Sequence, residues 1–310
     1  MLLWELVGAA VGAGFASGKE IASFFARYGR WGYAGIIASG AMMMLSYEPM
    51  PDRWRKRWPE KLWKSLLSII LITTGGTMMA GAGEIWRNIL PLKWSSCIGH
   101  IVSFCFCWLL AAKTKDGLAW MSRILFCFFT VILIVSFCQP QSKGVMVSEY
   151  EPMAAIVSGV THGGFNAALQ WPMIANVHVP LLQRKAAVRK AAMFLMAVMT
   201  AGLALMLRHP NLIGESMPFM IMIRGVGRTG YYAFALCLYL AVLSTLTACM
   251  KAVKCSLMPI SGMILISCVG FQDAVSGIYP VLGAVSALIL LTAKMVNSAA
   301  GPFLSRKDML

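Results

Sequence analysis

Residues 8–29 read GAAVGAGFASGKEIASFFARYG, an apolar stretch that is dense in glycine and then turns charged. Its glycines stand at positions 8, 12, 14 and 18. Each glycine inside a helix costs roughly 1 kcal/mol relative to alanine. Because Phe15 and Ser17 lie among these glycines and Lys19 and Glu20 follow directly, we expect this helix to be interrupted near residues 12–17.

The composition around this stretch is that of an integral membrane protein. Of 310 residues, 59% are hydrophobic and 13% are charged, and the mean hydropathy is +0.72. Too little polar sequence remains to cover a soluble domain. With roughly 20 apolar residues per crossing plus a loop, the chain has room for about ten transmembrane helices.

Apolar runs separated by charged or proline-containing turns place ten segments in two sets of five. The first set is 2–26, 32–50, 62–90, 95–111 and 118–138, and the second is 153–178, 186–207, 229–253, 256–271 and 274–296. An odd number of spans per half means that the halves are inverted relative to each other. We therefore predict one transmembrane domain over 1–310, with repeat one at about 1–140, repeat two at about 150–296, and a short cytoplasmic tail at 297–310.

The positive charges give this arrangement an orientation. Of the 27 Lys and Arg residues, 17 fall in the loops on the side of the N-terminus and 8 in the opposite loops, which favours both termini inside. The basic and aromatic run DRWRKRWPEKLWK at 52–64 is interpreted as an interfacial belt, and no nucleic-acid partner is predicted. No cleavable signal peptide is evident, so the first helix begins almost at Met1 or a short tail precedes it.

The sixth segment resembles the first. Residues 158–165 read SGVTHGGF, so that Gly14-Phe15 recurs as Gly164-Phe165. Its breakers and polar residues are Gly159, Gly163, Gly164, His162, Asn166, Gln170 and Pro172, and we predict that this helix is interrupted too. Paired broken helices in inverted halves are typical of the binding site of a secondary transporter, because freed backbone groups must line a cavity. The alternative is that these glycines permit close helix packing.

The stretch GAGFASGKEIASFFARYG at 12–29 resembles the opening of the YkvI-like bacterial membrane proteins, within the amino acid/polyamine/organocation superfamily. That resemblance implies the LeuT-type fold, an all-α arrangement of two inverted five-helix repeats with helices one and six unwound around a substrate. It also implies a multi-pass location in the bacterial cell membrane.

The resemblance further implies ion and substrate sites. One sodium ion would bind the carbonyls of Gly8, Val11 and Ala241 and the hydroxyls of Ser244 and Thr245. The alternative for these hydroxyls is bonding to their own helix carbonyls. Phe15 stands where a second sodium site has asparagine, which argues against that second site.

The substrate carboxylate would rest on the backbone N–H groups of Ala13 and Gly14, with the dipole of the following half-helix behind them. Phe165 would wall the substrate, although packing is an equal alternative. The full predicted substrate-binding set is Ala13, Gly14, Phe15, Ser17, His162, Gly163, Gly164, Phe165 and Asn166.

Charged and polar residues within the spans are candidates for gating or coupling, namely Lys19, Glu20, Glu84 and Gln170. Lys19 and Glu20 would form an outer gate or a surface ion pair. His162 could carry a coupling proton or act as a structural hydrogen-bonding residue.

No HExxH motif, nucleotide-binding loop or nucleophile-base arrangement is evident, so an enzyme is not predicted. The nine cysteines lack the spacing of metal ligands or disulfides, and no cofactor other than a coupling sodium ion is expected. The sequence thus predicts a secondary transporter of an amino acid or similar small organic solute, driven by sodium. A proton-coupled transporter and a non-transporting ligand-sensing subunit are the alternatives.

Overall fold

The computed structural model describes residues 2–47, 60–90, 92–113, 130, 137, 151–176, 179–253 and 257–299. These residues form helices and connecting turns, with no strand among them. Most of the predicted fifth segment at 118–138 and most of the basic run at 52–64 lie outside the described residues. The all-helical class is confirmed for the part of the chain that is described.

The helices of the first half follow the predicted segments closely. They are α1 (Leu2–Ala10), α2 (Ala13–Ala16), α3 (Lys19–Phe24), η1 (Ala26–Trp31), α4 (Gly32–Met44), η2 (Leu45–Tyr47), α6 (Glu60–Ile89) and α7 (Ser95–Lys113). The second half contains α9 (Pro152–Asn176), α10 (Leu181–Arg208), η3 (Pro210–Leu212), α11 (Pro218–Ile223), η4 (Arg224–Val226), α12 (Arg228–Ala252), α13 (Leu257–Val269), α14 (Phe271–Asp273), η5 (Ala274–Ile278) and α15 (Tyr279–Ala299).

Several of these helices have the length and composition of membrane spans. Within the described ranges, four apolar stretches are long enough to cross a bilayer: Ser65–Ile89, Leu181–Arg208, Arg228–Ala252 and Phe271–Met295. Ser95–Ala111 and Leu257–Val269 are shorter apolar helices. Large apolar side chains such as Leu182, Leu257 and Met258 are at least 80% exposed, as expected where the surrounding solvent is lipid. The protein is therefore a helical, multi-pass membrane protein, whereas the count of ten spans stays a prediction.

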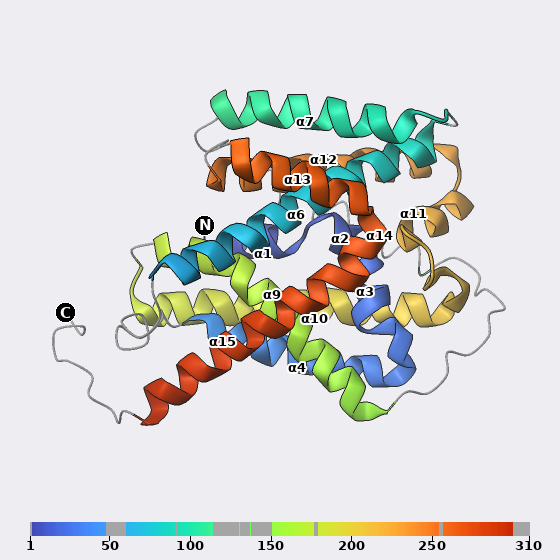
Figure 1. Cartoon of the computed structure of the whole chain (residues 1–310). Helices are drawn as coiled ribbons and strands as arrows, with labels where there is room; N and C mark the ends of the chain where they lie inside the picture. Colours follow the sequence, from blue (N-terminus) through green and yellow to red (C-terminus); the bar gives the residue numbers. More distant parts are fainter. Residues whose placement is uncertain are drawn as a thin grey trace.

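The helices gather in two groups, with the N-terminal segment between them (Figure 1). In one group α6 packs against α7, α12 and α13, and α7 also packs against α12. In the other, α9 packs against α4 and α15, and α10 packs against α4. α1 contacts α9 and α10, whereas α2 contacts α6 and α12. The N-terminal segment thus spans the boundary between the two groups.

The first predicted helix is interrupted twice, which confirms the expected break. α1 ends at Ala10, and α2 begins at Ala13 after Gly12, whose backbone is extended (φ −95°, ψ −170°). A second interruption follows at Gly18, which adopts the left-handed conformation with φ +83°. α2 is therefore only four residues long. The half-helix dipole predicted behind Ala13 and Gly14 is correspondingly short, because it ends at the second break.

The prediction of a break in the sixth segment is wrong, because α9 is one continuous helix from Pro152 to Asn176. Its glycines are contact points between helices. A β-carbon on Gly159 would overlap the backbone of Gly35, and one on Gly164 would lie 2.6 Å from the carbonyl oxygen of Gly283. The alternative of close packing therefore holds for α9, where tight contacts with α4 and α15 outweigh the low helix propensity of glycine.

Candidate functional site

The predicted substrate-binding residues lie deep in the protein on two neighbouring segments. Ala13, Gly14 and Phe15 form α2 and Ser17 follows it, while His162, Gly163, Gly164, Phe165 and Asn166 occupy the middle of α9. All nine are buried. The interruption between α1 and α3 thus places irregular backbone next to polar side chains, away from the lipid-facing surface.

One backbone group at the interruption, the Ala13 N–H, has only a weak partner. The Ala13 N–H donates to the thioether sulfur of Met78 on α6 at 3.4 Å, and a thioether is a weak acceptor. The Ser17 hydroxyl donates to the Gly14 carbonyl at 3.2 Å and accepts from the Lys19 N–H at 3.3 Å. A carboxylate oxygen would be a stronger acceptor than Met78 for the Ala13 N–H, as the predicted substrate contact requires.

Glu20 connects the interruption to α9. Its Oε2 lies 3.4 Å from Nε2 of His162, and its Oε1 lies so close to Gly14 that a β-carbon there would overlap it. The amide nitrogen of Asn166 lies 3.2 Å from the same Nε2. The Ser39 hydroxyl of α4 lies 2.8 Å from Nδ1 on the other side of the ring. We call these four residues, Ser39, Glu20, His162 and Asn166, the Glu20 cluster.

The order Ser39, His162, Glu20 resembles the nucleophile, base and acid of a hydrolase, an arrangement that the sequence did not reveal. However, Ser39 has no exposed surface. Gly163 packs directly on it, because a β-carbon at Gly163 would lie 2.5 Å from the Ser39 carbonyl oxygen. The hydroxyl is therefore enclosed between α4 and α9, with no room beside it for a substrate carbonyl.

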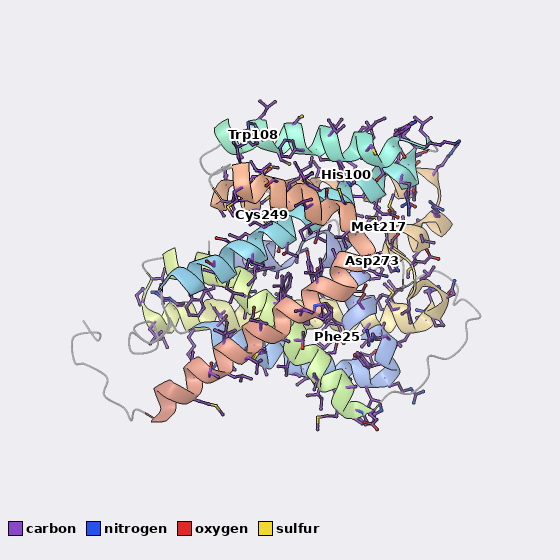
Figure 2. All side chains as sticks on the ribbon, in the orientation of Figure 1. Phe25, His100, Trp108, Met217, Cys249 and Asp273 are labelled. Atoms are coloured by element: carbon purple, nitrogen blue, oxygen red, sulfur yellow. The ribbon has the colours of Figure 1, made fainter. Side chains whose placement is uncertain are left out.

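Aromatic rings surround the Glu20 cluster. The edges of Phe24 and Phe25 contact the His162 ring, with centroids 5.1 and 4.9 Å away. The Phe165 ring stacks on the ring of Tyr279 of α15, with the centroids 4.2 Å apart and the ring planes at 29°. The predicted aromatic wall of the substrate site is therefore packed against a second ring. Phe25 is labelled among the side chains in Figure 2.

The Tyr279 hydroxyl is a polar group that sequence reasoning missed. It interacts electrostatically with Glu20 and lies near the hydroxyls of Thr74 and Thr77 on α6. Within the described structure, the hydroxyls of Tyr279 and Thr74 are buried, and their approach to each other lacks the geometry of a full hydrogen bond. Because buried polar groups are nearly always paired, these hydroxyls mark a point where a polar ligand atom would be stabilised.

Lys19 and Glu20 do not form the surface ion pair that was one interpretation of them. Both are buried, and they point to different partners. The Lys19 ammonium donates to the Glu215 carbonyl oxygen at 2.8 Å and lies 3.5 Å from that of Gly214. It also interacts electrostatically with the side chains of Glu215 and Asp273. Lys19 therefore connects the interrupted helix to the loop that precedes α11.

The loop and α11 are held in place at two further points. The Phe219 N–H of α11 donates to the Ser17 carbonyl at 3.0 Å, and the Ser216 hydroxyl donates to Glu84 on α6 at 2.7 Å. Glu84 also pairs with Arg87 at 2.6 Å. Met217 and Asp273 lie toward the same side of the molecule in Figure 2. We call residues 213–223 the α11 cap.

The remaining predicted residues lie on the opposite side of the interruption. The Gln170 side chain is buried on α9, and its amide donates to the Leu6 carbonyl of α1 at 3.5 Å. In the predicted sodium set, Gly8 belongs to α1, Val11 to the interruption, and Ala241, Ser244 and Thr245 to α12. The Thr245 methyl group lies 3.9 Å from the position of a β-carbon on Gly12, so α12 does meet the interruption.

The hydroxyls of the sodium set bond to their own helix, as their alternative interpretation expected. Ser244 and Thr245 both donate to the Ala241 carbonyl, at 2.9 and 3.1 Å. A hydroxyl that donates its hydrogen keeps its lone pairs, so these oxygens retain the capacity to bind a cation. Coordination by these residues stays a prediction.

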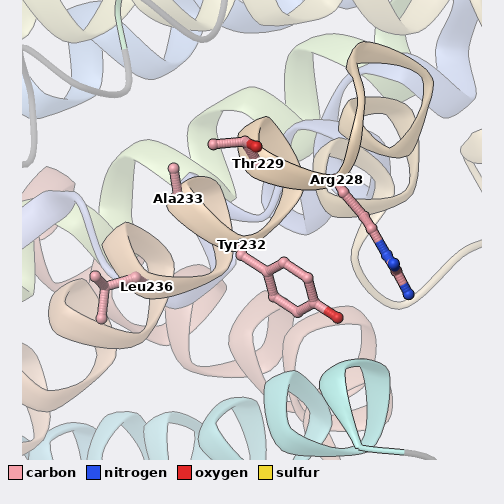
Figure 3. A pocket seen from close by; sticks show the side chains of 5 residues that line it. All are labelled: Arg228, Thr229, Tyr232, Ala233 and Leu236. Carbon is pink, nitrogen blue, oxygen red and sulfur yellow. The ribbon is translucent and has the colours of Figure 1, made fainter.

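A separate groove of about 550 Å³ lies on the surface at the beginning of α12 (Figure 3). It is lined by Arg228, Thr229, Tyr232, Ala233 and Leu236. None of them belongs to the predicted sets, and the groove is open to the outside. It is therefore distinct from the buried residues around the interruption.

Comparison with known proteins gives one similarity that extends over nearly the whole chain. No protein-family model matches. YkvI of Bacillus subtilis (strain 168), described as an uncharacterized membrane protein, is 22% identical over 92% of this chain and 92% of its own length. This similarity supports the resemblance to YkvI-like membrane proteins seen at residues 12–29.

Proposed function

We propose that the protein is a secondary active transporter that moves an amino acid or similar small organic solute by alternating access, and that it is not an enzyme. The observation that carries this proposal is the double interruption between α1 and α3 at buried positions. Unpaired backbone at membrane depth is tolerated where it lines a cavity or binds a solute.

The packing of the helices supports an inverted repeat of the LeuT type. Suppose that the first to fourth segments (α1, α4, α6 and α7) correspond to the sixth to ninth (α9, α10, α12 and α13). The contact of α1 with α10 then corresponds to the contact of α9 with α4. In the same way, the contact of α6 with α13 corresponds to the contact of α12 with α7. All four pairs are in contact, and so are α4 with α10 and α6 with α12, each of which corresponds to itself. Two pairs depart from this symmetry: α6 packs along α7 whereas α12 and α13 are not close neighbours, and α6 contacts α9 whereas α12 and α1 are not close neighbours.

The substrate in this proposal binds between the interruption and α9. Its carboxylate accepts from the N–H groups of Ala13 and Gly14, and its polar groups meet the buried hydroxyls of Tyr279 and Thr74. Since α9 is continuous, it supplies side chains and no freed carbonyl groups. The α11 cap closes the outer route in this conformation, and Lys19 is its gate residue.

Inward sodium flow is the proposed driving force, with the ion bound between the carbonyls of Gly8 and Val11 and the α12 residues Ala241, Ser244 and Thr245. The support is the contact between α12 and Gly12. Oxygen ligands without a full negative charge suit a monovalent cation that must also be released. The Glu20 cluster favours proton coupling as a second candidate, for which the buried pair of Glu20 and His162 is the specific observation.

Uptake into proteoliposomes tests this proposal. The wild-type chain, Ser244→Ala with Thr245→Ala, and Thr292→Ala would be given labelled amino acids and amines under imposed sodium or proton gradients. Thr292 is a matched control, because its hydroxyl also bonds to its own helix but is exposed on α15. We expect sodium-driven uptake by the wild type and the control, and loss of sodium dependence in the double variant.

Unchanged sodium dependence in the double variant would remove the sodium site from the proposal. Absence of gradient-driven uptake across a broad panel, together with a ligand-induced rise in melting temperature, would favour the ligand-sensing subunit instead.

A further inference from the structure

Glu20 and His162 form a buried pair of titratable side chains at the meeting point of three helices. Glu20 belongs to α3, His162 to α9, and Ser39, which contacts the far side of the imidazole ring, to α4. Glu20 and His162 are 4% and 1% exposed. An ionised carboxylate at this depth is costly unless a proton or a cation accompanies it.

The geometry of the ring leaves a place for one proton. The Ser39 hydroxyl lies 2.8 Å from Nδ1, and the Asn166 amide nitrogen lies 3.2 Å from Nε2, at which it can donate. A neutral ring with its hydrogen on Nε2 donates to Glu20 and accepts from Ser39; if Asn166 donates to Nε2 instead, the hydrogen is on Nδ1, and the lone pairs of Nε2 and of Glu20 Oε2 face each other at 3.4 Å. A proton placed between these two atoms converts this repulsive contact into a hydrogen bond.

The surrounding charges do not replace that proton. Lys19, the nearest residue of opposite charge along the chain, is directed to the α11 cap, where Glu215 and Asp273 act on it. Tyr279 from α15 faces Glu20 with a hydroxyl group. Within the described residues, α1, α6, α10 and η1 contribute no hydrogen bond or ion pair to Glu20 or His162.

The pair also bridges the moving part of the proposed transporter to its neighbour. Glu20 Oε1 lies against Gly14 in the interrupted segment, while Oε2 lies at His162 on the continuous α9. A displacement of α3 would separate the two groups and open both to water. Binding of a proton by the pair would therefore be linked to the position of the interruption.

We propose that Glu20 and His162 bind one proton between them in the conformation described here and release it to water when α3 moves away from α9. The shared proton follows from the contact itself, and its release during a cycle rests on the proposed transport function. No covalent bond forms or breaks apart from those to the proton, which comes from water and returns to it.

The shared proton is tested by solid-state NMR on the full chain in lipid vesicles, with ¹⁵N-labelled histidine. The chain contains four histidines, and the signals that disappear in His162→Gln belong to His162. We expect the Nε2 signal of His162 to change its protonation with pH in the wild type and to be altered in Glu20→Gln. Glu151→Gln is the control, because Glu151 is exposed directly before α9.

A His162 titration that is the same in Glu20→Gln as in the wild type would overturn the proposal. If Glu20→Gln does not fold, Glu20→Asp keeps the charge but shortens the side chain, and it must also alter the titration. Substrate-dependent proton movement, followed with a pH-sensitive dye inside proteoliposomes, tests the release step. If the titration of His162 depends on Glu20 but no solute is taken up, the proton site is supported and the proposed transport function is refuted.

Discussion

Gly18 shows at the scale of one residue how the interruption is held in place. Its φ of +83° lies in the left-handed region, where a β-carbon costs about 1–2 kcal/mol. A β-carbon there would also lie 2.6 Å from Met206 and 2.9 Å from Phe219. This glycine therefore turns the chain at a point where α10 and α11 leave no room for a side chain. The turn directs Lys19 and Glu20 to different partners.

We predict that Gly18→Ala lowers the melting temperature of the purified protein, because the strained backbone and the two contacts act together. Gly230→Ala is the comparison. Gly230 lies in α12 with its nearest neighbour at an ordinary 3.4 Å, so alanine there should stabilise the helix by roughly 0.5–1 kcal/mol. Equal melting temperatures for Gly18→Ala and the wild type would contradict the role given to Gly18.

The sequence predicted this residue-level pattern in part. Glycine spacing located the interruption, because a helix with so many glycines is costly wherever it folds. The same spacing could not show that Glu20 turns toward His162 while Lys19 turns toward Glu215. Those contacts join residues 142 and 196 positions apart in the chain, and nothing local in the sequence encodes them.

At the scale of the element, α9 is the clearest difference between expectation and structure. Its glycines and polar residues match those of the first segment in kind, yet the helix is continuous. The difference arises because glycines can break a helix or admit a neighbour, and the outcome depends on the partner surface. Gly35 on α4 and Gly283 on α15 provide that surface, and both belong to other helices.

We predict that Gly159→Ala destabilises the protein by about 1–3 kcal/mol, since a methyl group would have to separate α9 from the backbone of α4 at Gly35. Gly277→Ala is the matched control, because no atom lies within 4 Å of its β-carbon position. Thermal unfolding in detergent measures both changes. A Gly159→Ala protein as stable as the control would show that α4 and α9 do not rely on this close contact.

At the scale of the whole molecule, the interrupted segment lies between two helix groups and is covered at one end by the α11 cap. α2 contacts α6 and α12 in one group, and α1 and α3 contact α9 and α10 in the other. A relative movement of the two groups would therefore act first on residues 11–18. The beginning of α1 and the end of α15 lie toward the same side of the molecule, away from the cap (Figure 1).

The closing contact of the cap is testable by labelling from the outside. Ser17 has no exposed surface, and its carbonyl accepts from Phe219 of the cap. We predict that Ser17→Cys reacts slowly with a membrane-impermeant maleimide, and that adding Lys19→Met speeds the reaction because the ammonium contact with the Glu215 carbonyl is lost. Lys93→Met removes the same charge from an exposed position and should leave the rate unchanged. Mass spectrometry of the peptide with residue 17 separates this label from labelled native cysteines. Equal maleimide reaction rates at residue 17 with Lys19→Met and with Lys93→Met would refute the gate role of Lys19.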